Sequence, residues 1–593
     1  MAEGFMHRYS DELAALRRRA ARFADAFPKI AGRLRMTGDV ADDPHVERLI
    51  QSFAYSAARV RQKLDDEFPE LTDGLLETLY PHYLAPLPSM SIVRLAPSEA
   101  LASPQIVPRH TEIVAEPVRG ESCRFRTTQD VEVVPVEIVA ASLSGQPINA
   151  PPSPYAGAAS CLRLSLRARD VRMPLAAIGL KSLRLYLASP WQLAVSLYEL
   201  LANHTLGVAL ALHADDAAPV FLSRTNLKPV GFEAEQSMLP YPASSFSGYR
   251  LLTEFFAMPR KFLFLDIDGL DSWSGHRLDV FIYLDASDTK LERTVSASDF
   301  VLNATPVVNL FRQTCEPVPL DGARTEYPLL PDARRQTTRE IYMIEKVLLT
   351  GPKIGDELCP PFFGRSQRGG AASVYWQASR RFDEDDGTSD MEVAFVDRMQ
   401  HPAAAIDAVA SIDALCLNRD LPEQLPFGGG HPSLQLVSGN EAVSSVYALM
   451  PPTPSIRMNQ EQGRSWRLLS HLLLNHLSIF DNEGAALKDI LSLYAFRDSA
   501  ETRQLVDAIV HVDAHSSIAR LRGGGMVPGT EIVLDFDPAA IDRASTYLFG
   551  AVLERFFSLY TSVNSFTRLT VSLKGQSAPV ARWPARAAER PLL

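Results

Sequence analysis

An apolar stripe along one predicted helix near the start of the chain constrains its fold most. Pro44 suits the first position of a helix, where its missing N–H has no partner to lose, and Asp43 before it is the expected N-cap. Apolar residues then recur three and four positions apart, which predicts a helix with one apolar side: Val46, Leu49, Ile50, Phe53, Ala57, Val60 and Leu64. Such a helix does not stay folded alone in water, so it needs neighbours.

Two further segments predict helices close to this one. Apolar residues at helical spacing extend over 13–27 and 71–80, and a proline ends each segment. Three helices joined by short loops favour a small antiparallel bundle, which has little interior of its own. We therefore propose a partner interface on the bundle helix, with packing inside the same chain as the alternative. The candidate residues are Val46, Leu49, Ile50, Phe53 and Val60.

Beyond residue 89 the apolar spacing changes from helical to alternating. Residues 162–167 and 183–187 alternate apolar with polar side chains, as half-buried strands do. Residues 191–203 predict one amphipathic helix. Further strands are predicted where β-branched and aromatic residues gather, at 131–139, 263–267 and 280–284. The middle of the chain is therefore expected to be mainly β.

The last part of the chain mixes both patterns. It predicts helices over 464–478 and 487–494 and strands over 532–536 and 569–573. Between these strands, residues 547–560 form a helical segment that is apolar around most of its circumference. Such a helix is either sunk in a core or pressed against a partner. Its candidate partner or core residues are Phe549, Phe556, Phe557 and Tyr560.

The chain has 593 residues, too many for one hydrophobic core. We expect an α+β multidomain fold with an N-terminal helical bundle, mainly β middle domains and an α+β C-terminal domain. The predicted domains are 1–90 (helical), 91–310 (β-rich), 311–450 (a second β-rich domain) and 451–593 (α+β).

Charge, cysteines and hydropathy exclude several classes of protein. The net charge of -11 argues against a general nucleic-acid binder, which needs a basic surface. Five widely spaced cysteines fit neither a disulfide framework nor a zinc site, so we expect reduced thiols. No long uncharged apolar run predicts a membrane span, and Asp11 and Glu12 stand where a secretory signal needs apolar residues. We expect a cytoplasmic chain that begins at Met1.

Catalytic and cofactor motifs do not converge on a site. His471 and His476 are five residues apart, which does not match the spacing of a helical metal pair, and no serine lies in a GxSxG turn. A catalytic cysteine stays open, because its histidine partner can lie anywhere in the sequence. We expect no enzyme activity, cofactor or metal.

Short motifs spread along nearly the whole chain nevertheless form a specific set. They are DPHVERLI at 43–50, LDDEFP at 64–69, YPHY at 80–83, CRFRTT at 123–128, LYELL at 197–201, YRLLTEFF at 249–256, VNLF at 308–311, CLNRDLP at 416–422, WRL at 466–468 and FFSLYTSVNSF at 556–566. In this order they resemble the TssF family, also called ImpG or VasA, of type VI secretion baseplate subunits. His110 departs from the family pattern, which has a glycine in this turn.

The resemblance implies a structural protein of the cytoplasm, docked at the inner face of the membrane. TssF-like chains pair with TssG, as two copies to one, in a wedge that also contains TssK and TssE. The paired copies imply self-contact within the wedge. Six wedges surround the VgrG spike, on which the sheath and the Hcp tube assemble. In the related wedge proteins of contractile phage tails, N-terminal helices of three chains form a shared bundle, which is the cover that the stripe over 46–64 requires.

Two other functions are weighed against this one. A cytosolic hydrolase acting on envelope glycans needs a carboxylate pair, and the sequence does not locate one. A carbohydrate-binding β-protein is suggested by the β-rich middle and the tryptophans, but these are scattered: Trp191, Trp273, Trp376, Trp466 and Trp583.

Overall fold

The computed structural model of the chain divides into two units, and each is treated by itself. One unit comprises Met1–Thr78 and Asn459–Leu473, and the other Leu79–Met458 and Leu474–Leu593. The structure describes residues 44–65, 80–241, 245–322, 324–352, 355–362, 374–383, 388–396, 408–457, 484–494, 499–520, 525–561 and 565–587, with a few isolated residues and pairs besides.

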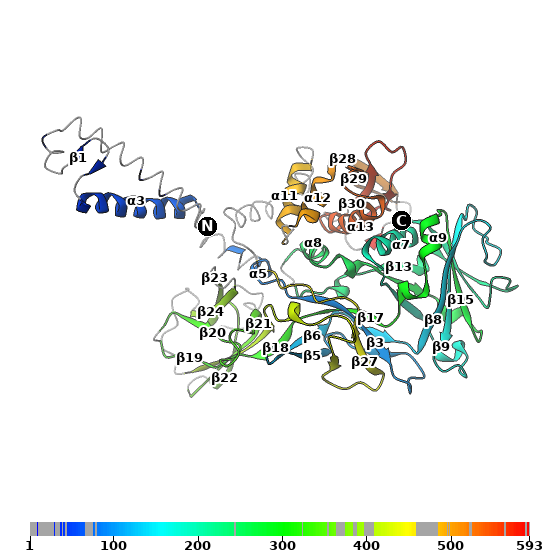
Figure 1. Ribbon diagram of the computed structural model, residues 1–593, viewed down its shortest axis with the longest axis horizontal. Helices are drawn as coiled ribbons and strands as arrows, with labels where there is room; N and C mark the ends of the chain where they lie inside the picture. The colour runs from blue at the N-terminus through cyan, green and yellow to red at the C-terminus, as the bar shows by residue number, and fades with distance from the viewer. Residues whose placement is uncertain are drawn as a thin grey trace. The chain divides into compact units, whose positions relative to one another are not determined.

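In the first unit, helix α3 spans Pro44–Asp65. It begins at the predicted proline, so the expected helix is confirmed (Figure 1). Before it, β1 (Met36–Thr37) and β2 (Val40–Ala41) pair antiparallel. The helices predicted over 13–27, 71–80 and 464–478 lie wholly or almost wholly outside the described residues, as does the Asp43 cap. The three-helix bundle therefore stays a prediction.

The second unit contains a closed antiparallel barrel in the order β17-β3-β27-β26-β5-β6. Its strands are β3 (Met90–Pro97), β5 (Glu112–Val118), β6 (Glu121–Thr127), β17 (Ala304–Val308), β26 (Leu434–Leu436) and β27 (Val443–Ala448). Side chains two residues apart point into it, for example Ile113 with Ala115 and Cys123 with Phe125, all buried. The barrel joins segments far apart in the sequence, and the four predicted domain boundaries stay a prediction.

Two antiparallel sheets are formed by the part of the chain between the barrel strands β6 and β17. One has the order β12-β11-β15-β9-β8, and the other β13-β14-β10-β16. Their strands are β8 (Val136–Ser144), β9 (Ser160–Ala168), β10 (Ser182–Leu187), β11 (Thr205–Ala211), β12 (Val220–Ser223), β13 (Leu227–Val230), β14 (Phe264–Asp268), β15 (Leu278–Leu284) and β16 (Phe300–Val301). The alternating segments predicted as strands are confirmed in β9 and β10, and Leu162, Leu164 and Leu166 are buried as the alternation requires. Helix α7 (Trp191–His204) confirms the predicted amphipathic helix.

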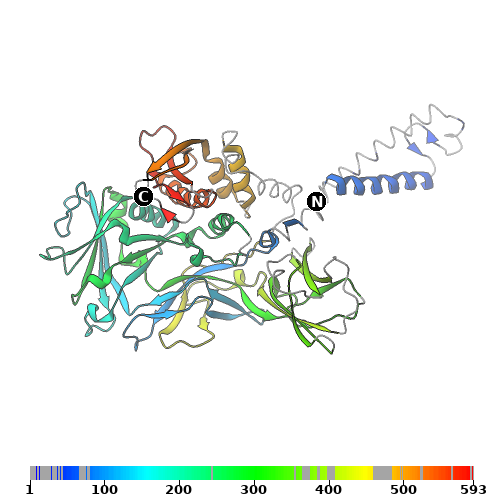
Figure 2. The same ribbon diagram turned by 180° about the vertical axis from the view of Figure 1, so that it is seen from behind.

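Two more sheets share one core and form a sandwich. The sheet β18-β25-β21-β22 also holds β19, and β20-β24-β23 forms the second sheet (Figure 2). Their strands are β18 (Phe311–Thr314), β19 (Val318–Pro319), β20 (Glu326–Leu329), β21 (Glu340–Gly351), β22 (Gly355–Cys359), β23 (Tyr375–Asp383), β24 (Thr388–Val396) and β25 (Val409–Leu417). Val347 and Ile412 of the first sheet lie in the same buried cluster as Val393 and Phe395 of the second.

The C-terminal part is α+β. Strands β28 (Ile509–Arg520), β29 (Met526–Phe536) and β30 (Phe566–Leu573) form its sheet, and helices α11 (Ala485–Tyr494) and α12 (Ala500–Asp507) precede it. Strands β29 and β30 are parallel, and helix α13 (Arg543–Leu559) connects them. The helices and strands predicted over 487–494, 532–536, 547–560 and 569–573 are thus confirmed. A parallel pair needs such a crossover, because a tight turn cannot join strands that run the same way.

The turn at His110 explains why the family pattern has glycine there. His110 adopts a φ of 67°, a left-handed conformation that side chains with a Cβ disfavour. Its backbone N–H donates to the Thr127 carbonyl at 3.0 Å, which holds the turn in place. The His110 side chain is exposed and adds little packing of its own.

We expect His110→Gly to raise the free energy of unfolding by about 0.5–1 kcal/mol. Glycine removes a left-handed strain of roughly 1–2 kcal/mol but gains entropy in the unfolded chain. Urea denaturation measures the change. Thr111→Gly is the matched control and should destabilise, because its Oγ1 donates to the Pro108 carbonyl at 2.6 Å. If His110→Gly has a lower free energy of unfolding than the wild type, the backbone strain at His110 is contradicted.

Candidate functional site

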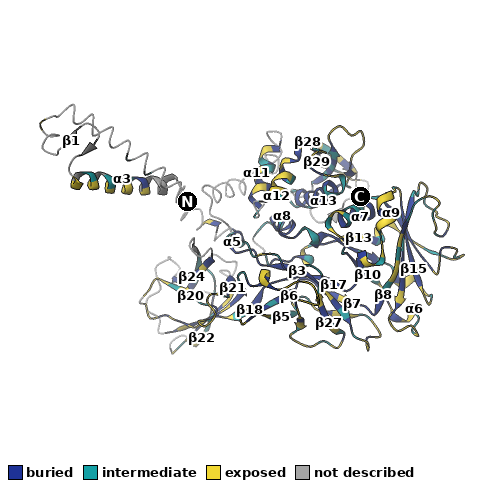
Figure 3. Ribbon diagram, viewed as in Figure 1, coloured by how far each residue is buried: buried dark blue, intermediate teal, exposed yellow. Residues whose placement is uncertain are grey.

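One edge of the apolar stripe on α3 is open to solvent. Leu49 is 70% exposed and Phe53 is 64% exposed. Figure 3 shows exposed positions in yellow along α3. The two residues are four positions apart, so they form one continuous apolar patch on the helix surface. For aliphatic and aromatic side chains of this size, solvent exposure forgoes roughly 1.5–3 kcal/mol each of burial energy. Exposed contiguous apolar patches are the usual form of interaction sites, so this pair is the candidate interface.

The closed side of α3 lies away from the stripe, beside the predicted polar residue Glu47. Ala54 and Ala58 are fully buried, and they too are four positions apart on the helix. On the polar side, Tyr55 contacts Tyr9 edge-on with ring centroids 6.5 Å apart. Helix α3 is therefore closed at two small side chains, whereas the larger side chains of Leu49 and Phe53 are exposed.

The other three candidate residues of the stripe, Val46, Ile50 and Val60, lie on the described backbone of α3, while their side chains lie outside the description. At 100° per residue all three fall between or beside Leu49 and Phe53. Their contribution to the patch stays a prediction.

The aromatic helix α13 lies in a core of the same chain. It packs against β30 on one side and against α7 and α8 (Ser247–Ala257) on the other (Figure 1). Phe549, Phe556 and Phe557 are buried, whereas Tyr560 at the end of the helix is partly exposed. Phe549 stacks on Phe255 of α8 with ring centroids 5.4 Å apart. The helix is apolar around its circumference because protein covers it on two sides.

Gly550 allows this close packing of α13. A Cβ at this position would lie 2.9 Å from Cη2 of Trp583 and 3.1 Å from Cγ2 of Val571. Glycine in a helix interior costs about 1 kcal/mol relative to alanine, and here it lets the helix approach the sheet.

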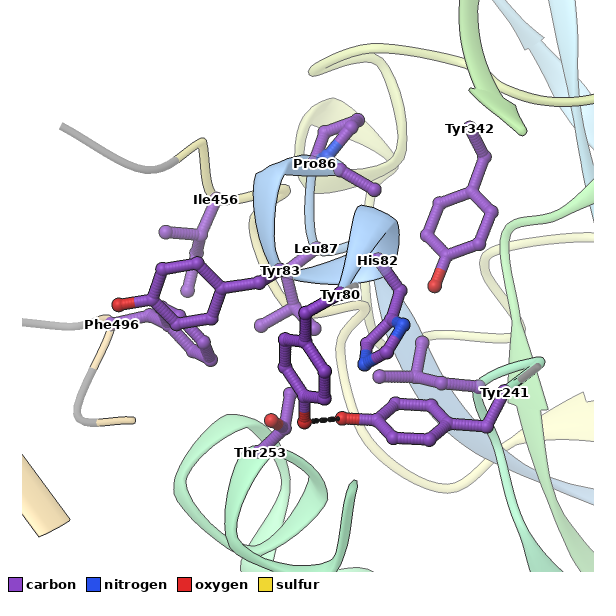
Figure 4. Close-up of a pocket in the computed structure, with 12 residues that line it drawn as sticks. Tyr80, His82, Tyr83, Pro86, Leu87, Tyr241, Thr253, Tyr342, Ile456 and Phe496 are labelled. Carbon is purple, nitrogen blue, oxygen red and sulfur yellow. Dashed lines mark hydrogen bonds between the residues drawn. The ribbon is translucent and has the colours of Figure 1, made fainter. Parts of the chain in front are cut away.

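The YPHY segment begins the second unit as an aromatic anchor. Tyr80 precedes the short helix α5 (Pro81–Leu84) as its N-cap, Tyr83 lies within the helix, and both are buried. The Tyr80 and Tyr241 hydroxyls are hydrogen-bonded to each other (Figure 4). Tyr83 lies edge-on to Tyr494. A cavity of about 20 Å³ remains between these rings, which is room for one water molecule.

His82 in this anchor is neutral rather than catalytic. Its ring lies between Tyr80 and Tyr241, with centroids 3.8 Å and 3.7 Å away. Burial lowers the pKa of His82 to about 3, and neither ring nitrogen has a hydrogen-bond partner among the described residues. With this pKa the ring stays neutral and is a weak base near neutral pH, so it is poorly matched to general acid–base catalysis.

The family of the chain follows from its match to known proteins. The family model described as "Type VI secretion system, TssF" matches residues 1–590 of the chain. The chain belongs to the TssF family. It is 35% identical over 619 residues to the type VI secretion system component TssF1 of Pseudomonas aeruginosa, and the match covers 99% of both chains.

Solved structures agree with the TssF assignment. A chain in the TssK-TssF-TssG baseplate subcomplex, determined by cryo-electron microscopy, is 27% identical with a TM-score of 0.75, over 92% of this chain and 99% of that chain. A chain in the baseplate complex from the type VI secretion system has a TM-score of 0.63 at 24% identity, over 99% of this chain and 100% of that chain, and so shares the fold. This TssF-family chain is a structural component of the type VI secretion baseplate.

The cysteines, which the sequence allowed as catalytic nucleophiles, are poorly suited to that role in this TssF-family chain. All five are free and buried, and burial raises the pKa of Cys123, Cys161, Cys315 and Cys359 to about 12. Burial also raises the pKa of Cys416. A protonated, inaccessible thiol is a poor nucleophile.

The described residues also give no evidence for a metal site, a membrane-spanning helix or a binding face built from tryptophans. Among the described residues, no cluster of three His, Cys, Asp or Glu side chains is placed to hold a metal ion. Every helix in that part of the chain is too short or too polar to span a bilayer. Trp583 stacks on Tyr547 and Trp376 packs against the sandwich core, so these two tryptophans share no binding face.

Proposed function

We propose that this chain is a wedge subunit that assembles with TssG, TssK and TssE around the VgrG spike. Two copies of the chain would pair with one TssG and contact each other in the wedge. The wedges would dock at the inner face of the cytoplasmic membrane and initiate sheath and Hcp tube assembly. TssK and TssG accompany TssF in the similar baseplate subcomplex, which supports them as the first partners to test.

The exposed pair Leu49 and Phe53 carries the proposal. A phenylalanine that projects from a helix enters a pocket on a partner readily, and such aromatic anchors supply about 2 kcal/mol or more of binding energy each. In the free chain these two side chains have no such cover. A partner that supplies one gains their burial energy without rearranging the helix.

The partner cover would be helical. One side of α3 already packs through Ala54 and Ala58, so the open edge fits one or two further helices side by side with it. We propose that helices of TssG and of a second copy of this chain supply them and complete an N-terminal bundle. Val46, Ile50 and Val60 would then lie in the same interface.

Co-expression with TssG from the same bacterium tests the proposal. We expect the two chains to elute as one complex from size-exclusion chromatography, with a mass by light scattering that corresponds to two copies of this chain and one TssG. Addition of TssK should increase that mass. Separate elution of this chain and TssG at micromolar concentration would overturn the proposal.

A further inference from the structure

A second candidate site is a cleft in the second unit, between the barrel, the sandwich and α8. Its volume is about 510 Å³, the size of pockets that bind peptides and organic ligands. Four arginines and one glutamate provide the charged lining: Arg109, Arg126, Arg250, Arg312 and Glu345. They come from the turn before β5, from β6, α8, β18 and β21, which the sequence keeps far apart.

Arg126 is the most unusual of these side chains. It is 8% exposed, and within the described part of the chain its guanidinium has no hydrogen-bond or ion-pair partner. Burial lowers the pKa of Arg126 to about 10, and the negative charge of Glu345 opposes this shift only in part. Burying an unpaired charge lowers the free energy of unfolding. Folding stability therefore does not explain why an arginine stands at position 126.

Arg250 and Arg109 also each have a buried donor without a partner among the described residues. Arg250 is 5% exposed, and its Nη1 donates to the Ala234 carbonyl at 3.1 Å. Nη2 of Arg109 donates to the carbonyl and the hydroxyl of Ser237 at 3.0 Å and 2.8 Å. In both arginines the buried Nε has no partner among the described residues.

The acidic groups around the cleft already have hydrogen-bond or charge partners. Glu345 pairs with Arg312, with Oε2 and Nε 2.9 Å apart. Glu254, behind Arg250, forms an ion pair with Lys261 and accepts hydrogen bonds from two backbone amides. Asp130 accepts from the backbone N–H of Arg109 at 2.7 Å, and Glu235 acts on Arg109 only through its charge. Four arginines against one lining glutamate therefore leave an excess of positive charge.

The start of α8 adds to this charge. Ser245 and Ser247 line the cleft where the helix begins, and the N-cap residue Phe246 offers no side-chain acceptor to the first amides. The N-terminus of a helix carries a partial positive charge that favours anions.

We propose that this cleft docks an acidic peptide segment of a partner chain, with carboxylates bound by Arg126 and Arg250. Guanidinium groups bind carboxylates through paired hydrogen bonds, and the guanidinium of Arg126 has no partner among the described residues. Met238, Leu239 and Leu415 add an apolar lining, and a single small ion would leave most of the volume empty. The choice of a peptide rests on the proposed role as an assembly subunit.

Fluorescence anisotropy with a labelled hexaglutamate peptide tests the proposal on the full-length chain in its complex with TssG. We expect binding that weakens with salt and is absent for hexaglutamine. Arg126→Met should weaken it by about tenfold or more, since a charge-assisted hydrogen bond is lost. The matched control Arg167→Met removes an exposed arginine paired with Glu137 and should change the affinity by less than about twofold.

Thermal unfolding separates docking from a structural role. Arg126→Met removes an unpaired buried charge, so its melting temperature should equal or exceed that of the wild type. Three results would overturn the inference: a clearly lower melting temperature, equal peptide affinity of wild type and Arg126→Met, or binding of inorganic phosphate without binding of hexaglutamate. Each of them leaves the complex with TssG, and hence the proposed function, intact.

Discussion

Replacing Phe53 with aspartate is expected to abolish the complex with TssG and to leave the free chain folded. Phe53 is 64% exposed, so the aspartate remains in water in the free chain and the free energy of unfolding should change by less than about 0.5 kcal/mol. In the complex the same carboxylate would be buried without a partner, which costs several kcal/mol. A loss of about 3 kcal/mol weakens binding by roughly a hundredfold.

Ser52→Asp is the matched control for this experiment. Ser52 precedes Phe53 on α3 and is exposed, and its hydroxyl donates to the Arg48 carbonyl at 2.8 Å. The control adds the same charge outside the apolar patch, so its complex with TssG should elute unchanged. A Phe53→Asp chain that still binds TssG would exclude the α3 patch as the interface. A Phe53→Asp chain that unfolds would show that the patch packs inside its own chain.

The largest loss of stability is expected for Lys261→Met. Lys261 and Glu254 form an ion pair with side chains 1% and 0% exposed. Burial lowers the pKa of Lys261 to about 8, whereas Glu254, despite its burial, has its pKa held below the usual value by Lys261 and Arg250. Without Lys261, the buried carboxylate of Glu254 keeps Arg250 as a positively charged neighbour but loses its ion-pair partner. Breaking such a pair costs about 3–5 kcal/mol of unfolding free energy.

Two further variants make this prediction specific. Lys228→Met breaks an ion pair of similar geometry, with Nζ 2.6 Å from Oδ2 of Asp268, but Lys228 is 61% exposed and the loss should stay below about 1 kcal/mol. The double variant Glu254→Gln with Lys261→Met removes both charges. Its glutamine still accepts from the backbone amides of Met238 and Leu239, so it should recover most of the stability. Guanidinium unfolding curves compare the variants, and a double variant no more stable than Lys261→Met would contradict the unpaired charge as the cause.

Several elements could be predicted because their signal lies in residues close together in the sequence. Pro44 and the three-four spacing after it predict α3, and the alternation of Leu162, Leu164 and Leu166 predicts β9. The motifs spread from residue 43 to residue 566 were enough to predict the TssF family, which the family match confirms. Such motifs identify a family because each one consists of residues adjacent in the sequence, so no knowledge of the fold is needed to find them.

The sequence alone left other questions to the tertiary structure. The apolar circumference of residues 547–560 predicts cover on every side, but only the packing of β30, α7 and α8 makes Phe549 a core residue of this chain. The sequence does not show that α3 is closed at Ala54 and Ala58, because its apolar stripe predicts burial at Leu49 and Phe53 instead.

The basic cleft is the clearest case of a feature that the sequence hides. No basic run marks it, since Arg109, Arg126, Arg250 and Arg312 lie on separate elements that come together only in the folded chain. Local spacing determines which segments become helices and strands, because neighbouring side chains fix the periodicity of burial. Which of these segments meet, and which charges therefore share a cleft, depends on the sum of many weak contacts between distant residues, and only the tertiary structure decides it.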